Sequence, residues 1–204
     1  TQHRVTLTRG FWMLETEVTQ EMWESVMGSG LETQMRLAGR EYNYGKGRNY
    51  PMYYVNWAEC QNFCRKLSQK LGGSIQLPTE AQWEYACRAG MTGKYGGSGD
   101  LDDMGWYGDN SGSGTHQVGT KQANAWGLYD MHGNVWEWCQ DWYDSSYYDE
   151  SPTSDPSGPS SGSYRVFRGG SWNRNALSCR SANRSYNSPE SRLIVLGFRV
   201  CSEQ

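Results

Sequence analysis

The sequence predicts an α+β fold with few regular elements, an aromatic core and much irregular loop. Aromatic residues make up 14% of the 204 residues, with 10 Trp and 14 Tyr, so indole and phenol rings have to supply much of the buried area. The 25 Gly indicate many tight turns. Segments typical of strands lie near both ends of the chain, and segments typical of helices lie between them. We expect one domain over residues 1–204.

The N-terminal part begins with strand-like sequence. Residues 5–19, VTLTRGFWMLETEVT, alternate and are rich in β-branched residues, which predicts a strand or a bent pair of strands. A short helix follows over residues 19–28, with Thr19 as its N-cap and Gly28 as its stop. Residues 29–52 show no periodicity, and we expect a loop there.

The strongest helix prediction covers residues 56–72. Asn56 and Glu59 have the spacing of a capping box, and Gly72 ends the segment. Apolar residues at helical spacing predict one buried stripe, formed by Trp57, Cys60, Cys64, Leu67 and Leu71.

A third helix is predicted over residues 79–90. It follows Pro78 and starts at a second capping box, formed by Thr79 and Gln82. Its inward side is expected to carry Trp83, Ala86 and Cys87.

The remaining half of the chain is mostly loop. Residues 90–125 are rich in Gly and Asp, and residues 145–164 form a polar Pro/Ser/Gly segment that we expect to be exposed. Strands are predicted at RVFRGGSW (165–172) and LGFRV (196–200).

Composition excludes two function classes. The formal net charge is −3 and no basic run occurs, so nucleic-acid binding by phosphate neutralisation is not expected. No stretch of about 18 apolar residues could span a membrane, and the first residues, TQHRVTLTRGF, read as a strand rather than a signal peptide.

Four segments together resemble the formylglycine-generating-enzyme (sulfatase-modifying factor) domain family. They are LPTEAQWEYACRAG, NAWGLYDMHGNVWEWCQDWY, RVFRGGSW and LGFRV, and their order and spacing match over nearly the whole chain. The resemblance implies an elaborated C-type-lectin-like fold, in which helices pack on a small twisted antiparallel sheet with much irregular loop.

The enzymatic features of the family are missing. Its enzyme uses two cysteines, about five residues apart after GGSW, to bind copper, whereas this segment holds only Cys179, so a paired thiolate site is not possible. An iron branch of the family needs convergent histidines, but His3, His116 and His132 lie far apart. We therefore expect no catalytic metal and no enzyme; the alternative is an enzyme of this family with an unrecognised active site.

One structural calcium is the expected cofactor. The family pattern places two side chains and two carbonyls on a calcium ion, and the matching positions here are Asp130, Gly133, Val135 and Glu137. The alternative is that Glu137 forms an ion pair with an arginine such as Arg168.

The six cysteines contain no C-x-x-C pair, so a zinc site is not indicated. Disulfides and buried thiols both remain open from the spacing. The resemblance implies the pairs Cys64–Cys201 and Cys87–Cys179.

Residues 173–195 have an unusual mixture of side chains. Most of the types present, Asn, Ser, Tyr, Leu, Ile and Val, differ from an asparagine codon only at its adenines. Framework-like residues such as Trp172, Cys179, Pro189 and Arg192 stand between them. The candidate ligand-binding residues are Asn173, Arg174, Asn175, Leu177, Ser178, Asn183, Ser185, Tyr186, Asn187, Ser188, Ser191, Leu193, Ile194 and Val195.

This pattern resembles the variable proteins of diversity-generating retroelements, in which adenine-directed copying rewrites a ligand-binding surface. The resemblance implies a non-enzymatic monomer at the cell surface or outside the cell, lipid-anchored through a segment absent from this chain. Its partner would be a protein or another surface ligand. A plain partner-docking domain is a further alternative. Exposure of residues 193–195 would make them a contact patch, whereas burial of Ile194 would make that residue part of the core.

Overall fold

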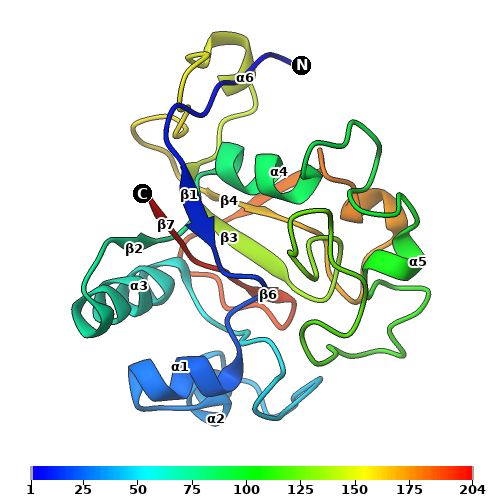
Figure 1. The fold of residues 1–204 in the computed structure, drawn as a ribbon. Coiled ribbons are helices and arrows are strands. Elements are labelled where there is room, and N and C mark those ends of the chain that lie inside the picture. The colour runs from blue at the N-terminus through cyan, green and yellow to red at the C-terminus, as the bar shows by residue number, and fades with distance from the viewer. Residues whose placement is uncertain (1, 204) are drawn as a thin grey trace.

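Two small sheets form the centre of the computed structural model, which describes residues 2–203 (Figure 1). In the first sheet the strand order is β1-β7-β2, and in the second it is β5-β4-β3-β6. All strand pairs are antiparallel except β3 and β6, which are parallel. The α+β class is confirmed, with two sheets where one was expected. The strands are β1 Phe11–Met13, β2 Ile75–Gln76, β3 Trp136–Trp142, β4 Arg165–Arg168, β5 Arg184–Asn187, β6 Leu196–Gly197 and β7 Cys201–Glu203.

Helices lie around these sheets, with α1 and α2 at the end opposite α6 (Figure 1). None of the helices within residues 2–203 has the length and apolar character that crossing a bilayer needs. The helices are α1 Gln20–Met27, α2 Leu31–Leu37, α3 Trp57–Leu71, α4 Glu80–Arg88, α5 Leu101–Met104, α6 Tyr147–Glu150 and the 3-10 helix η1 Ala176–Cys179.

The predicted helix starts are confirmed. At α3, Glu59 N donates to Asn56 Oδ1 at 2.9 Å and Asn56 N donates to Glu59 Oε2 at 3.1 Å. Thr79 and Gln82 form the same reciprocal pair at α4. Both boxes satisfy N–H groups that a helix end leaves without a partner.

Several local predictions were wrong. The short helices α5 and α6 lie in segments that were predicted to be loops. Helix α2 lies inside the segment predicted to be a loop, and burial of Leu31 and Gln34 explains its stability better than local periodicity does. Leu71 is 67% exposed and leaves the predicted α3 stripe. The first predicted strand shrinks to β1 because its partner β7 has only three residues.

The predicted C-terminal strand over residues 196–200 contains only β6, and β7 begins directly after it. Residues of β6 pair with β3, and the chain then crosses to pair with β1 through β7. Phe198 and Arg199 lie completely buried at this crossing. The last strand-like segment therefore connects the two sheets.

The main core is aromatic, as predicted. Trp23 stacks on Phe63 with ring centroids 5.7 Å apart, and Phe198 packs edge-on against both rings. Trp136, Trp138 and other buried aromatic and aliphatic side chains complete this cluster. Aromatic rings therefore supply much of the buried apolar area that Leu, Ile and Val supply in other proteins.

Candidate ligand-binding surface

The candidate segment, residues 173–195, begins shortly after β4, which ends at Arg168. Gly170 has φ +82, and a Cβ there would lie 2.4 Å from Cys179 Sγ, so only glycine lets the chain turn this closely against η1. The chain then forms β5 and returns through residues 188–195 to β6. Strand β5 is the outer strand of its sheet, so one of its edges has no strand partner within residues 2–203.

Most candidate side chains reach solvent. Asn173, Arg174, Asn175, Leu177 and Tyr186 are exposed, and eight others are partly exposed. Val195 is the exception: it is 5% exposed and belongs to the main core, which corrects its prediction as a contact residue.

The aliphatic triplet is therefore not a free patch. Leu193 and Ile194 are partly buried and pack against the main core beside Val195. This outcome is close to the alternative in which Ile194 belongs to the core. The accessible part of the candidate surface therefore lies mainly in residues 173–191.

The main chain of the segment is anchored by residues outside it. Besides the pairing of β5 with β4, seven of its carbonyl oxygens accept hydrogen bonds from side-chain or backbone donors elsewhere in the fold. These bonds are Gly108 N to Arg174 O (2.8 Å), Tyr95 Oη to Ala176 O (2.9 Å), His132 Nδ1 to Cys179 O (2.8 Å), Arg168 Nη1 to Asn183 O (2.5 Å), Trp57 N to Pro189 O (3.0 Å), Tyr54 N to Leu193 O (3.1 Å) and Trp136 N to Val195 O (2.7 Å).

The candidate side chains, in contrast, bond only locally. Within residues 2–203, every side-chain hydrogen bond of a candidate residue goes to a partner at most three residues away. Asn175, for example, caps η1 by accepting from Ser178 N at 3.1 Å. The hydrogen bonds that anchor this segment thus do not depend on which side chains the candidate positions carry.

Two framework arginines add side-chain anchors. Arg184 on β5 makes a two-point ion pair with Glu80, with N–O distances of 2.9 and 2.6 Å. Arg192 reaches Glu59 at 2.8 Å and Gln34 at 2.7 Å. Paired hydrogen bonds between a guanidinium and a carboxylate fix direction as well as distance.

His132 fixes the position of η1 through a hydrogen bond to its last residue. Its Nδ1 donates to Cys179 O, and its Nε2 accepts from Gly96 N at 2.9 Å, which is the pattern of a neutral imidazole. Burial lowers the pKa of His132 to about 4, so the ring stays neutral at physiological pH. His116 makes a different contact, because its ring stacks on the ring of Trp106.

The sole thiol of the segment is not available for chemistry. Cys179 is fully buried, and burial raises the pKa of its thiol to about 12. A nucleophilic or metal-binding cysteine acts as the thiolate. Cys179 is therefore a packing residue next to Gly170.

The Glu137 carboxylate forms a buried ion pair with Arg199. Arg199 Nε donates to Glu137 Oε2 at 2.6 Å and Nη2 donates to Oε1 at 2.7 Å, while Trp83 Nε1 adds a third bond at 2.6 Å. All these groups are buried. The alternative of an arginine pair is the one found, with Arg199 in the place proposed for Arg168.

Asp130 is the second carboxylate of the expected calcium set. Asp130 accepts from Gly119 N at 2.7 Å through Oδ2, and its buried Oδ1 has no partner. Val135, which follows Gly133 by two residues, donates its N–H to Glu17. Burial raises the pKa of Asp130 to about 6. In residues 2–203 no three His, Cys, Asp or Glu side chains are arranged to hold a metal. The expected set has only two carboxylates, with carbonyl oxygens as the other ligands, so the calcium site stays a prediction.

All six cysteines are free and buried. The imidazole of His132 lies between Cys87 and Cys179, with its Nε2 at 3.7 Å from Cys87 Sγ and its Nδ1 on the Cys179 carbonyl. Burial raises the pKa of Cys64 and of Cys201 to about 12. The implied bridges Cys64–Cys201 and Cys87–Cys179 are not formed, and reduced packing describes the structure.

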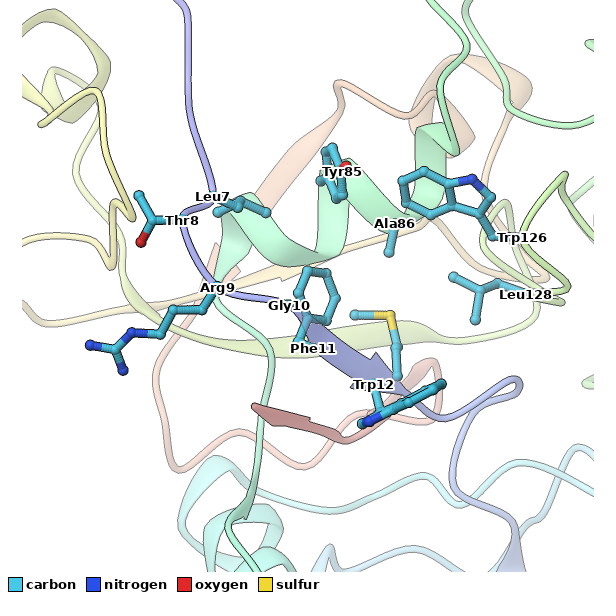
Figure 2. Close-up of a pocket in the computed structure, with 11 residues that line it drawn as sticks. Leu7, Thr8, Arg9, Gly10, Phe11, Trp12, Tyr85, Ala86, Trp126 and Leu128 are labelled. Carbon is cyan, nitrogen blue, oxygen red and sulfur yellow. The ribbon is translucent and has the colours of Figure 1, made fainter. Parts of the chain in front are cut away.

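A separate groove of about 430 Å³ lies between β1 and α4 (Figure 2). Tyr85 and Ala86 face it from α4, and Phe11 and Trp12 face it from β1, with Trp126 at one end. None of the candidate residues lines this groove. It is thus a different surface from the one that the sequence singled out.

Sequence reasoning missed the residues that hold the candidate surface. Arg184 and His132 were not recognised because their partners lie 104 and 47 residues away in the chain. A charged residue within each predicted strand, such as Arg168 in RVFR, was the only local sign of long-range hydrogen bonds and ion pairs.

The chain is similar to proteins of known name. The sequence pattern of the sulfatase-modifying factor enzyme 1-like domain matches residues 1–204. Formylglycine-generating enzyme of Streptomyces coelicolor is 38% identical over an alignment of 173 residues that covers 76% of this chain and 53% of that protein. The enzyme of Mus musculus is 35% identical over 173 residues, covering 76% of this chain and 45% of that protein. The chain spans about half the length of these curated relatives.

Two solved structures share the fold. Treponema denticola variable protein 1 has a TM-score of 0.87 and 35% identity, covering 98% of this chain and 86% of that one. PvdO from Pseudomonas aeruginosa has a TM-score of 0.80 and 27% identity, covering 98% and 83%. Because the family pattern covers the whole chain and the fold agrees, the chain belongs to the sulfatase-modifying factor enzyme 1-like domain family.

Proposed function

We propose that the protein is a non-enzymatic ligand-binding protein whose contacts come from the accessible residues of segment 173–194. The observation that carries the proposal is the division between main chain and side chains. Seven carbonyls and two framework arginines anchor the segment, while the candidate side chains bond only to near neighbours.

Such a division suits a surface whose sequence changes. A new side chain at Asn173 or Ser185 breaks no long-range hydrogen bond, so the backbone keeps its course. Exposed Tyr with Ser and Asn is the residue mixture of a paratope, where rigid rings supply area and short polar groups adapt. The similarity to Treponema denticola variable protein 1 supports the same reading.

We further propose that the candidate codons are diversified by a retroelement and that the protein is displayed at a cell surface, with a lipid anchor on a preceding segment. The genome tests the first part. A near-copy of the codons for residues 165–200, with Asn codons at the candidate positions and a reverse transcriptase nearby, is expected. A genome without such a copy would contradict diversification and leave ligand binding standing.

A library tests ligand binding directly. The accessible candidate positions are randomised in the full chain, and the library is selected on phage against immobilised lysozyme. Folded binders are expected, and restoring the starting residues in a binder should abolish its binding. A matched library at exposed positions outside the segment, including Tyr85 and Trp126, serves as the control. Equal yields from both libraries, or mostly unfolded members in the first, would refute the proposal.

The alternative is an enzyme of the formylglycine-generating type, which the identity to the Streptomyces coelicolor protein favours. The buried, protonated Cys179 and the absence of a second cysteine between residues 173 and 195 argue against it. Incubation of the chain with copper and a cysteine-containing sulfatase peptide should give no aldehyde. Turnover would establish the alternative.

A further inference from the structure

Fixed tyrosines continue the candidate surface beyond the segment. Tyr186 on β5 stacks on Tyr143, with ring centroids 3.8 Å apart and planes 22° apart. Tyr164 lies against Tyr186 at 5.3 Å, with its plane tilted by 49°. Tyr164 and Tyr186 are each 45% exposed. Two tilted, half-exposed rings backed by a third make an aromatic corner at the outer strand of the sheet.

Contacts within the protein hold these tyrosine rings in place without a ligand. Arg184 stands behind it, with its guanidinium 4.8 Å from the Tyr143 ring centroid and 4.2 Å from that of Tyr148. Glu80 neutralises Arg184 through the two-point ion pair. Tyr143 and Tyr164 lie outside segment 173–195, so they stay constant whatever residues the segment carries.

One exposed carboxylate lies beside the corner, in addition to the paired Arg184. Asp144 follows Tyr143, is exposed, and forms no ion pair within residues 2–203. Hydrogen bonds from Ser146 lower the pKa of Asp144, so its carboxylate remains ionised at neutral pH. The faces of aromatic rings attract cations, and arginines of this chain already stack on rings nearby: Arg165 lies 3.7 Å from the centroid of Trp57.

We propose that Tyr143, Tyr164 and Tyr186, with Asp144 at the rim, form a subsite that accepts an arginine or lysine side chain of a protein ligand. The inference rests on the proposed function in taking residue 186 as part of the ligand-binding face. Tyr143, Asp144 and Tyr164 lie outside the segment, so variants that keep a tyrosine at position 186 would share this subsite. The changing residues around it would then select among ligands.

The test is an NMR titration of the full chain carrying ¹³C-labelled tyrosine. The probes are N-acetyl-arginine amide and its uncharged analogue N-acetyl-citrulline amide. The ring signals of Tyr143, Tyr164 and Tyr186 are expected to shift with the arginine probe, with an affinity on the order of millimolar, because exposed cation–π contacts are weak. The citrulline probe should shift them at least about threefold less.

Variants locate the effect. Tyr164→Ala should remove the response of Tyr186, and Asp144→Asn should weaken it. Tyr85→Ala is the matched control, since Tyr85 is 53% exposed and contacts Phe11 and Trp126 in the separate groove. Equal shifts with both probes, or an unchanged response in Tyr164→Ala, would overturn the subsite.

The titration and the library can fail separately. Binders from the library with no arginine response would remove the subsite alone. An arginine response without any binders would remove the proposed function and leave a cation site at the corner.

Discussion

Replacing Arg184 by alanine should destabilise the fold far more than replacing Tyr186 by serine, although the two residues lie on the same short strand. Arg184 is a framework residue whose partner Glu80 is 4% exposed. Removing one member of a buried ion pair leaves the other charge without compensation, which costs about 3–5 kcal/mol. Arg168 remains 3.6 Å from Glu80, so we expect the lower value, about 3 kcal/mol.

Tyr186 has no such partner. Its replacement removes a half-exposed ring stack, and an aromatic pair contributes about 0.5–1.5 kcal/mol beyond its buried area. The expected difference between the two variants is therefore about 2 kcal/mol. With a urea m-value of ~2 kcal/mol/M, the midpoints should lie about 1 M apart.

Urea unfolding of the wild type and both variants, followed by tryptophan fluorescence, measures this difference. Comparable losses in the two variants would show that Tyr186 is as structural as Arg184. The separation of a fixed frame from a free surface would then be wrong, and the proposed function with it.

Three further predictions concern buried groups. Burial, with Glu80 nearby, raises the pKa of Asp141 to about 7; its unfolded value is near 3.9, so the native state binds the extra proton between these values. Stability should therefore fall as pH rises from about 4 to 7, by on the order of 4 kcal/mol, and Asp141→Asn should flatten this slope in thermal melts. Glu137→Gln should cost about 3 kcal/mol in urea by leaving Arg199 without its partner, equally with calcium or a chelator; a calcium-dependent loss would return Glu137 to a metal site. A thiol reagent should label no cysteine in the native protein and six in urea; two labelled thiols in unfolded, unreduced protein would restore the implied disulfides.

Local features were predictable because their partners lie close in the chain. The capping boxes join residues three apart, so Asn56 and Glu59 identify a helix start without any knowledge of the fold. Glycine stops and turn-rich loops follow the same logic. The family segments added the fold because they cover strands and helices on both sides of the core.

Partner choice was not predictable, because it depends on how distant elements meet. Glu137 lies opposite Arg168 in the β3–β4 register, yet its carboxylate turns to Arg199, 62 residues away. Arg168 pairs with Glu80 and Glu84 on α4 instead. Which arginine meets which acid is decided by the packing of α4 and the chain crossing at Arg199, and neither leaves a local pattern.

Val195 shows why codon type alone does not define a binding surface. Its residue type fits an adenine-derived codon as well as that of Leu177, which is 63% exposed, but Val195 is 5% exposed and packs in the main core. An asparagine or serine at position 195 would bury a polar group without a partner, at about 1–3 kcal/mol. Its carbonyl also accepts from Trp136 N just before β6, which holds the residue in place whatever its side chain. Position 195 therefore belongs to the frame, and a segment able to change freely has to end before the chain enters β6.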